Sequence, residues 1–589
     1  MIVSPGPDHT TSIMGIEFGL TLIAVAAAFV LPGIGSAWFT RIEAAFGRLA
    51  RRRWAAVAVV GLTEFVLRLS ILPCFPVPRP FVQDDFSFLL AADTFASGRL
   101  TNPTPAMWRH FESFHIVMNP TYMSMYFPGQ GLILAAGRVL FGNPWIGVLV
   151  VTALMCAAIC WMLQAWLPPS WALLGGMIAV LHLGLFSYWI NTYTGAASVA
   201  ALGGALVLGA FPRLIKNARV CEGILLAGGI VLLALSRPYE GFLLCLPVAG
   251  VLGRWILFGK NRPVSSELLR RAALPLALII AAGSWMAYYD DRVNGSALTL
   301  PYTINRATYA IAPYWIWQSP RPAPVYRHTV MRDYYEQVEM SVVKKAQSLH
   351  GFLFMTSVKA ILAVEFFAGA ALLPPLIMLP RVFRDRRTRF IVICCFVWAL
   401  GMALQIFMVC HYLAPFTAAF YVVGLQATRH LRVWRPSGQP VGVQMVRLIA
   451  IICIAMTALR VWAEPLHLNL AAGYPTAWTY SWYGPGELGG PRARVESDLR
   501  HLPGKQLAIV RYSPGHDSEW EWVYNDANIQ DSKIIWARDM GSADNLEIIH
   551  YYRERKVWLV QPDLQPATIS PYPIPEQAAG AQHGAPWGP

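Results

Sequence analysis

The sequence predicts an all-α polytopic membrane protein of about twelve transmembrane helices, followed by a small extracytoplasmic α/β domain. Its 589 residues are 56% hydrophobic and only 14% charged, with a mean hydropathy of +0.44, whereas soluble domains carry about 25% charged residues. Apolar runs of about 20 residues, the length that crosses the hydrocarbon, recur through 1–463 with arginine clusters between them. The remaining chain is polar and has the pattern of strands and helices.

The transmembrane domain, 1–463, is built from these apolar runs. We expect spans near 14–34, 54–74, 145–166, 171–190, 195–212, 221–236, 239–258, 271–289, 358–380, 390–409, 411–428 and 443–463. The run 130–142 is shorter and is interrupted by Gly137 and Arg138, so we expect it to be interfacial or re-entrant.

Basic residues between the spans predict the orientation. They form five clusters: Arg41 to Arg53, Arg213 to Arg219, Arg254 to Arg271, Arg381 to Arg389, and Arg429 to Arg447. With twelve spans and an outside N-terminus, all five fall on the cytoplasmic side. Short clusters between apolar runs also account for the net charge of +14 without nucleic-acid binding, which we do not expect.

This orientation places three hydrophilic pieces outside: the first outer loop (75–129), the large outer loop (290–357) and the C-terminal tail. Within the tail we expect an α/β domain over 464–565 and a disordered end over 566–589. Its strands are expected at 506–512, 533–538 and 556–560, with a helix at 545–555 before the last strand. This order favours a mostly parallel sheet.

Two adjacent carboxylates, Asp84 and Asp85, stand near the start of the first outer loop. If 85–97 is a helix on the membrane surface, Asp85, Leu89 and Ala92 share one face. Further polar and aromatic side chains follow in the same loop: Asp93, Arg99, Asn102, Trp108, Arg109, His110, Glu112, His115, Asn119, Tyr122 and Tyr126. Either the acids belong to an amphipathic helix and point at water, or they supply a general base or a metal ligand.

Ionisable residues in or beside the spans are functional candidates because they are costly there. Glu64 and Arg68 stand one helical turn apart, which fits either a self-neutralising pair or an arginine that meets a lipid phosphate at the outer mouth. Arg237 and Glu240 flank a proline turn, and that turn fits a local ion pair or phosphate binding. His411 lies at the outer end of another pair of spans.

The acidic pair and its position resemble the GT-C membrane glycosyltransferases. The closest similarity is to the family 39 group, which includes protein O-mannosyltransferases, the lipid A aminoarabinose transferase and Rgt-type lipopolysaccharide sugar transferases. Their acidic pair is followed by an aromatic residue and an alanine, matched here by Phe88 and Ala91 after Asp84 and Asp85. The stretch from Asp84 to Gly131 is also similar to uncharacterised bacterial members of this group.

The resemblance implies a bacterial inner-membrane glycosyltransferase with a periplasmic C-terminal domain. It would transfer a hexose or pentose, with inversion, from a polyprenyl-phosphate donor to a glycan, lipid or protein acceptor. Asp84 would be the catalytic base, and a positioned carboxylate suits proton abstraction. Cations must hold the departing phosphate, and the candidates are Arg109, His110, Arg237 and His411, with Arg68 beneath the loop.

The sequence does not decide whether the reaction depends on a metal ion. The family often places another acid in its second outer loop, but here this short outer loop reads Asn191-Thr192-Tyr193-Thr194-Gly195 and has no carboxylate. If a divalent metal binds, Asp85 is the expected ligand, because Asp84 would be engaged with the acceptor. No other cofactor is expected.

Two other classes of function remain as alternatives. A secondary transporter or lipid-linked-sugar flippase would place its functional charges near mid-membrane and show pseudo-symmetric halves. We find no repeat of that kind, and the polar residues gather at one face. A non-catalytic scaffold or sensor would bind a cell-wall component through its tail, with Asp84 and Asp85 dispensable.

Overall fold

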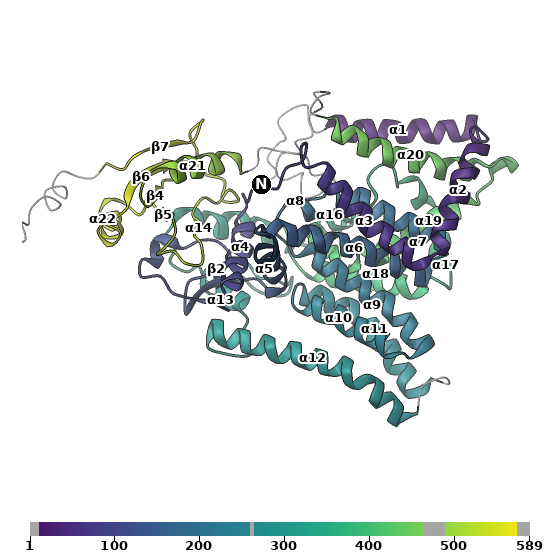
Figure 1. Cartoon of the computed structure of the whole chain (residues 1–589), viewed down its shortest axis with the longest axis horizontal. Helices are drawn as coiled ribbons and strands as arrows, with labels where there is room; N and C mark the ends of the chain where they lie inside the picture. The colour runs from purple at the N-terminus through teal and green to yellow at the C-terminus, as the bar shows by residue number, and fades with distance from the viewer. Residues whose placement is uncertain (1–10, 260–263, 464–465, 467, 469–488, 574–589) are drawn as a thin grey trace, which may run out of the picture.

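A bundle of apolar helices carries a small α/β domain at one end (Figure 1). The computed structural model describes residues 11–259, 264–463, 466, 468 and 489–573. Parts of the predicted α/β domain and most of the predicted disordered end, including 574–589, lie outside these residues. The first outer loop and the large outer loop lie beside that domain.

Helices stand at all the positions where the sequence predicts spans. In chain order the helices of the first part are α1 (Thr11–Val30), α2 (Ser36–Arg51), α3 (Arg53–Ser70), α4 (Gln83–Ala96), α5 (Pro128–Phe141), α6 (Pro144–Trp166), α7 (Pro169–Ala179), α8 (Tyr188–Asn191), α9 (Ala197–Asn217), α10 (Val220–Ala234), α11 (Pro238–Phe258) and α12 (Ser265–Asn294). The π-helical turn η2 (Val180–Gly184) continues α7.

The second part of the bundle follows the large outer loop. Its helices are α13 (Pro301–Tyr309), α14 (Thr329–Asp333), α15 (Met340–Ala346), α16 (Leu349–Ala368), α17 (Leu379–Arg384), α18 (Arg389–Leu404), α19 (Thr417–Arg432) and α20 (Val441–Val461). The π-helical turn η3 (Tyr334–Glu339) joins α14 to α15, and the 3-10 turns η4 (Pro374–Met378) and η5 (Cys410–Phe416) precede α17 and α19.

Six of the described helices are long and apolar enough to cross a membrane: α6, α9, α11, α12, α16 and α20. The segments Pro374–Arg384 and Arg389–Leu404 meet at a bend of 109° and make a seventh if they count as one span. Shorter apolar helices are Gly15–Val30, Pro169–Gly184 and Val220–Ala234. A multi-pass helical architecture is therefore confirmed, and the number twelve stays a prediction.

Glycines allow the apolar helices to approach one another closely. A Cβ at Gly204 in α9 would lie 1.9 Å from the carbonyl oxygen of Pro415, and one at Gly147 in α6 would lie 2.1 Å from that of Ile133. Small residues at such contacts let helix backbones pack in a membrane, where van der Waals contact replaces the hydrophobic effect.

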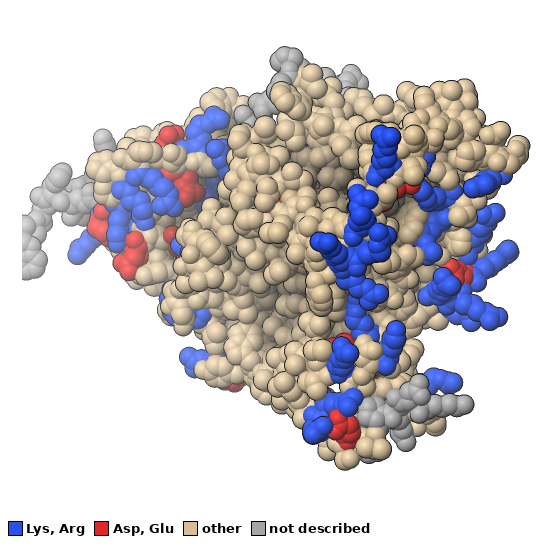
Figure 2. Space-filling view, turned by 45° about the vertical axis from the view of Figure 1, so that its right-hand side comes forward, with Lys and Arg blue, Asp and Glu red and all other residues tan. Residues whose placement is uncertain are grey.

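Charged side chains separate into two regions (Figure 2). Lys and Arg gather over the end of the bundle away from the C-terminal domain, and both signs occur on that domain, with a broad uncharged band between. The unpredicted helix α2 is amphipathic: it buries Gly47 and Ala50 and carries Arg48 and Arg51 in its last turn. This separation is the pattern expected for a chain that crosses a bilayer.

The C-terminal domain has a four-stranded sheet in the order β5-β4-β6-β7. The strands β4 (Gln506–Val510), β5 (Ile534–Arg538) and β6 (Lys556–Gln561) are parallel, and β7 (Thr568–Pro571) is antiparallel to β6. The three parallel strands and α22 (Ser542–Tyr551) lie where the sequence predicts them. Unpredicted are α21 (Gly490–His501) and β7, and β7 shows that order continues past 565.

The first outer loop is ordered between the bundle and the C-terminal domain. It contains α4 and a small antiparallel sheet in the order β1-β3-β2, in which β1 is Asn102–Pro103, β2 is Ile116–Val117 and β3 is Thr121–Ser124. Figure 1 shows α4 and β2 beside the C-terminal domain, with α13 and α14 of the large outer loop nearby. Three hydrophilic pieces that are far apart in sequence therefore meet around α4.

Candidate functional site

The acidic pair opens α4, and its two members have different environments. Both lie in the first turn of the helix, where the exposed N–H groups and the helix dipole favour negative charge. The side chain of Asp84 is 27% exposed, whereas Asp85 has no exposed surface. One carboxylate is therefore open to a ligand and the other is part of the core.

Asp84 is held by three side chains from two loops. His115 Nδ1 lies 2.6 Å from Asp84 Oδ1, the Tyr126 hydroxyl donates to the same oxygen, and Thr194 Oγ1 donates to Asp84 Oδ2 at 3.2 Å. Burial raises the pKa of Asp84, but the charge and hydrogen bond of His115 and the bond from Tyr126 outweigh it and hold the pKa well below its usual range. Asp84 is therefore ionised.

The sheet of the first outer loop places His115. The residue has a positive φ of 58°, which is uncommon for a side chain other than glycine, and it stands just before β2. Ser87 Oγ in α4 donates to the His115 carbonyl at 2.6 Å and lies 2.7 Å from Ser124 Oγ in β3. These bonds tie the helix to the sheet and point the imidazole at Asp84.

Asp85 joins the first outer loop to the short outer loop. Its Oδ1 accepts the backbone N–H of Tyr193 at 2.9 Å and its Oδ2 that of Phe81 at 3.3 Å. Burial and the charge of Asp84 raise the pKa of Asp85 to about 7, although the backbone bonds lower it. These contacts indicate that Asp85 has a structural role, because they fix the position of the loop that carries Thr194.

The predicted role of Asp85 as a metal ligand can be compared with its contacts. Each oxygen of Asp85 accepts one backbone N–H group and keeps a second lone pair. No group of three or more His, Cys, Asp or Glu side chains in the described ranges is arranged to hold a metal ion. The role of Asp85 as a metal ligand therefore stays a prediction.

Two of the predicted phosphate-binding residues lie next to this site. Arg237 donates twice to the Gly195 carbonyl, at 3.0 and 2.9 Å, and its guanidinium lies 4.6 Å from the centre of the Tyr412 ring. A Cβ on Gly195 would come within 2.7 Å of His411 Nδ1. Because Gly195 follows Thr194 directly, the structure brings Arg237 and His411 together with Asp84.

Arg68 holds the short outer loop from below. It is fully buried, and its terminal nitrogens donate to the carbonyl of Phe75 and to Asn191 Oδ1, both at 2.9 Å. The guanidinium also lies 4.7 Å from the centre of the Trp145 ring. These contacts fit a structural role for Arg68 better than phosphate binding.

Arg109 and His110 are not brought to Asp84. Arg109 is exposed, and its carbonyl accepts His328 Nε2 at 2.8 Å. His110 is buried against the C-terminal domain, with Nδ1 3.4 Å from the Arg538 carbonyl, and burial lowers its pKa. Within the described structure both residues join the first outer loop to its neighbours rather than line the acidic site.

Glu112 is the point where the three outer pieces meet. Its Oε1 accepts the Tyr309 hydroxyl at 2.9 Å and Arg327 Nη1 at 3.1 Å, both from the large outer loop. Its backbone carbonyl accepts Arg538 Nε from β5 of the C-terminal domain. Arg538 also forms a 2.6 Å ion pair with Glu521, with both side chains almost fully buried.

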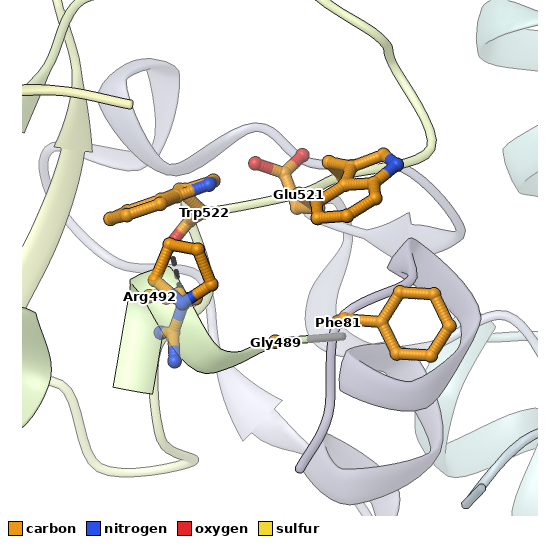
Figure 3. Close-up of a pocket in the computed structure, with 7 residues that line it drawn as sticks. Phe81, Gly489, Arg492, Glu521 and Trp522 are labelled. Atoms are coloured by element: carbon orange, nitrogen blue, oxygen red, sulfur yellow. Dashed lines mark hydrogen bonds between the residues drawn. The ribbon is translucent and has the colours of Figure 1, made fainter. Parts of the chain in front are cut away.

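The segment 519–527 seats the C-terminal domain on α4. Gln83 Nε2 donates to Glu519 Oε2 at 3.2 Å, and Asp93 Oδ2 accepts the N–H of Ala527 at 2.8 Å. Phe81 of the first outer loop and Arg492, Glu521 and Trp522 of the C-terminal domain line one pocket at this junction, and Figure 3 shows Phe81 on the opposite side from Arg492 and Trp522. The tail therefore lies directly beside the acidic site.

Sequence reasoning gave no role to His115, Tyr126, Thr194 or Glu519. His115 and Tyr126 share the loop of the acidic pair, and that concentration was their only signal. Thr194 lies 110 residues from Asp84 along the chain, and Glu519 lies in another domain. No local pattern identifies either of them.

Comparisons with known proteins find similar solved structures but no relatives by sequence. No family model and no curated protein matches the sequence. The chain is similar to the oligosaccharyltransferase of Archaeoglobus fulgidus, both with a tethered acceptor peptide (TM-score 0.46, 11% identity, 86% of this chain and 68% of that chain) and in the apo form (0.46, 12%, 86% and 69%).

A third similar structure is archaeal oligosaccharyltransferase AglB from the same organism, in complex with an inhibitory peptide and a dolichol-phosphate (TM-score 0.45, 12% identity, 86% of this chain and 69% of that chain). At these TM-scores the function has to come from the chemistry of the site itself.

Proposed function

We propose that this protein is a membrane glycosyltransferase that moves a sugar from a polyprenyl-phosphate donor to a cell-envelope acceptor, with Asp84 as general base. The observation that carries the proposal is the setting of Asp84. It is an ionised, partly open carboxylate where three outer segments meet above apolar helices, and it is joined through Thr194 and Gly195 to Arg237. We place this site on the periplasmic face of a bacterial inner membrane.

In the proposed reaction the acceptor's O–H or N–H group lies against Asp84. The acceptor atom attacks the anomeric carbon as the bond to the phosphate oxygen breaks, and its proton passes to Asp84, with inversion at the sugar. The contacts that keep Asp84 ionised also make it a weaker base. We expect the entering acceptor to displace the 3.2 Å bond from Thr194, which is the longest of the three contacts.

Arg237 and His411 are assigned to the leaving phosphate. Arg237 is fixed by its two bonds to Gly195 and by the Tyr412 ring, so its charge is preorganised rather than mobile. A fixed cation beside the developing phosphate charge stabilises the transition state more than a solvated one does. His411 is held by the Tyr188 hydroxyl, 3.1 Å from its Nδ1.

The direct test is Asp84→Asn in membranes that contain the full-length protein. We expect sugar transfer from radiolabelled undecaprenyl-phosphate hexoses and pentoses to envelope material to fall by about 10²–10⁴-fold, the usual contribution of a general base. Asp291→Asn, which changes an exposed acid away from the site, is the matched control. Full transfer by Asp84→Asn would overturn the assignment, and ion-gradient-driven uptake would favour the transporter alternative.

A further inference from the structure

The amphipathic helix α2 lies across the end of the bundle away from the C-terminal domain. It joins α1 to α3, and Figure 1 shows it running crosswise to α1 and α20. Lys and Arg side chains gather over this same end (Figure 2). An amphipathic helix in such a place lies in the plane of the membrane–water interface. The reaction proposed above gives this helix no task.

One face of α2 packs on the bundle. Glu43, Gly47 and Ala50 are spaced by four and three residues and therefore share a face, and the two small residues are buried. Glu43 forms ion pairs with Arg432 of α19, at 2.8 Å, and with Arg447 of α20, at 2.9 Å. These contacts fix how α2 is rotated about its axis, so its other faces point away from the protein.

A second face of α2 is apolar and exposed. Trp38 and Ile42 stand one helical turn apart, and they are 61% and 44% exposed. Tryptophan is enriched where a membrane protein meets the boundary between acyl chains and headgroups. This face therefore suits insertion into that boundary.

The third face of α2 is basic, and no acid neutralises it. Arg41, Arg48 and Arg51 are spaced by seven and three residues, so they share a face, and all three are exposed. Among the described residues, the ion pairs of α2 are those of Glu43 alone. The three arginines of this arginine face therefore keep their charge available to an outside partner.

We propose that α2 is an interfacial helix whose arginine face binds the anionic headgroups of phospholipids. Its apolar face enters the acyl-chain boundary, and the arginines lie at the level of the phosphates. Guanidinium groups suit this partner because they bind phosphate oxygens in pairs. A lipid explains both exposed faces, whereas a nucleic acid would use only the basic one. The surface lies apart from Asp84, so its test does not depend on the proposed reaction.

The test titrates the full-length protein in detergent with phosphatidylglycerol or phosphatidylcholine and counts bound lipid by native mass spectrometry. We expect the wild type to prefer phosphatidylglycerol. Each basic side chain near an anionic lipid surface contributes about fivefold to binding. Replacing Arg41, Arg48 and Arg51 together by Gln should therefore weaken phosphatidylglycerol binding at least tenfold and leave phosphatidylcholine binding unchanged.

The control is a triple variant that removes the same charge from exposed positions elsewhere: Arg292→Gln, Arg494→Gln and Arg553→Gln. It should bind phosphatidylglycerol as the wild type does. Equal binding of the two lipids by the wild type, or unchanged phosphatidylglycerol binding without the arginine face, would overturn the inference. So would tighter binding of an RNA oligonucleotide than of phosphatidylglycerol. If the triple variant of α2 does not fold, Arg48→Gln alone decides, with an expected loss of about fivefold.

Discussion

The backbone N–H of Tyr193 donates a 2.9 Å hydrogen bond to Asp85 Oδ1 and so joins two outer loops 108 residues apart in sequence. Thr194, the next residue, reaches the neighbouring carboxylate, Asp84. The acidic pair thus combines two tasks: a buried acid sets the position of a loop, and an open acid receives that loop's hydroxyl.

Replacing Asp85 by Ala leaves the N–H groups of Tyr193 and Phe81 without their buried acceptor. Each unpaired buried donor costs about 1–3 kcal/mol, so we expect increased hydrogen exchange in the short outer loop and at least a tenfold loss of transfer. Asp85→Asn keeps one acceptor oxygen and should show a smaller effect. Unchanged exchange at Tyr193 in Asp85→Ala would contradict this role.

The outer assembly is expected to lose stability as pH rises toward neutrality. Asp85 and Glu519 have pKa values raised to about 7 in the fold, so between about pH 4 and 7 the folded state binds more protons than the unfolded state, and its stability falls with pH. Thermal unfolding at pH 5 and pH 8 measures this loss. The double variant Asp85→Asn, Glu519→Gln should show a flatter profile, and an equally steep one would exclude these acids as the cause.

Gly195 cannot accept a side chain. Its φ of +81° lies in the left-handed region, and an added Cβ would meet the His411 ring at 2.7 Å. We expect Gly195→Ala to cost about 1–3 kcal/mol in local strain, to displace Thr194 and Arg237, and to lower transfer without unfolding the helices. Gly228→Ala, where nothing lies within 4 Å of the new Cβ, is the control and should be silent.

Arg237 is expected to need its guanidinium shape as well as its charge. Arg237→Lys retains the cation but cannot reproduce the two bonds to Gly195 and the planar contact with Tyr412. We expect transfer to fall about tenfold or more, since lysine replaces a fixed, planar group poorly. The rate of sugar transfer in membranes, measured at increasing amounts of donor, gives the size of the effect. A wild-type rate in Arg237→Lys would contradict the assignment of Arg237 to the leaving phosphate.

The Arg538–Glu521 pair is expected to hold the C-terminal domain in place. Arg538→Ala leaves Glu521 buried without its cation, a change that costs about 3–5 kcal/mol, and it removes the bond to the Glu112 carbonyl. Hydrogen exchange should rise in α4 and in 519–527 together. Arg511→Ala breaks a more exposed pair with Asp539, worth about 0–1 kcal/mol, and should leave α4 protected.

Local patterns predicted the elements well. Helices lie at every predicted span, and β4, β5, β6 and α22 lie within a few residues of their predicted positions. The amphipathic α2 was missed because its arginines were taken as a loop cluster, although a basic helix at a membrane surface has the same composition. The strand β7 was missed because its surroundings are rich in proline and glycine, and pairing with β6 overrides that local preference.

The sequence alone determined a chain of apolar helices, a polar α/β domain at its end and an acidic pair in the first outer loop, because hydropathy and periodicity are local properties. Only the tertiary structure decided which acid is partly exposed, which cations lie near it and where the C-terminal domain contacts α4. Asp84 meets Thr194, Gln83 meets Glu519, and Asp85 meets Tyr193, through contacts that span 100 residues or more. Burial and charge at such a site depend on neighbours that no local pattern specifies.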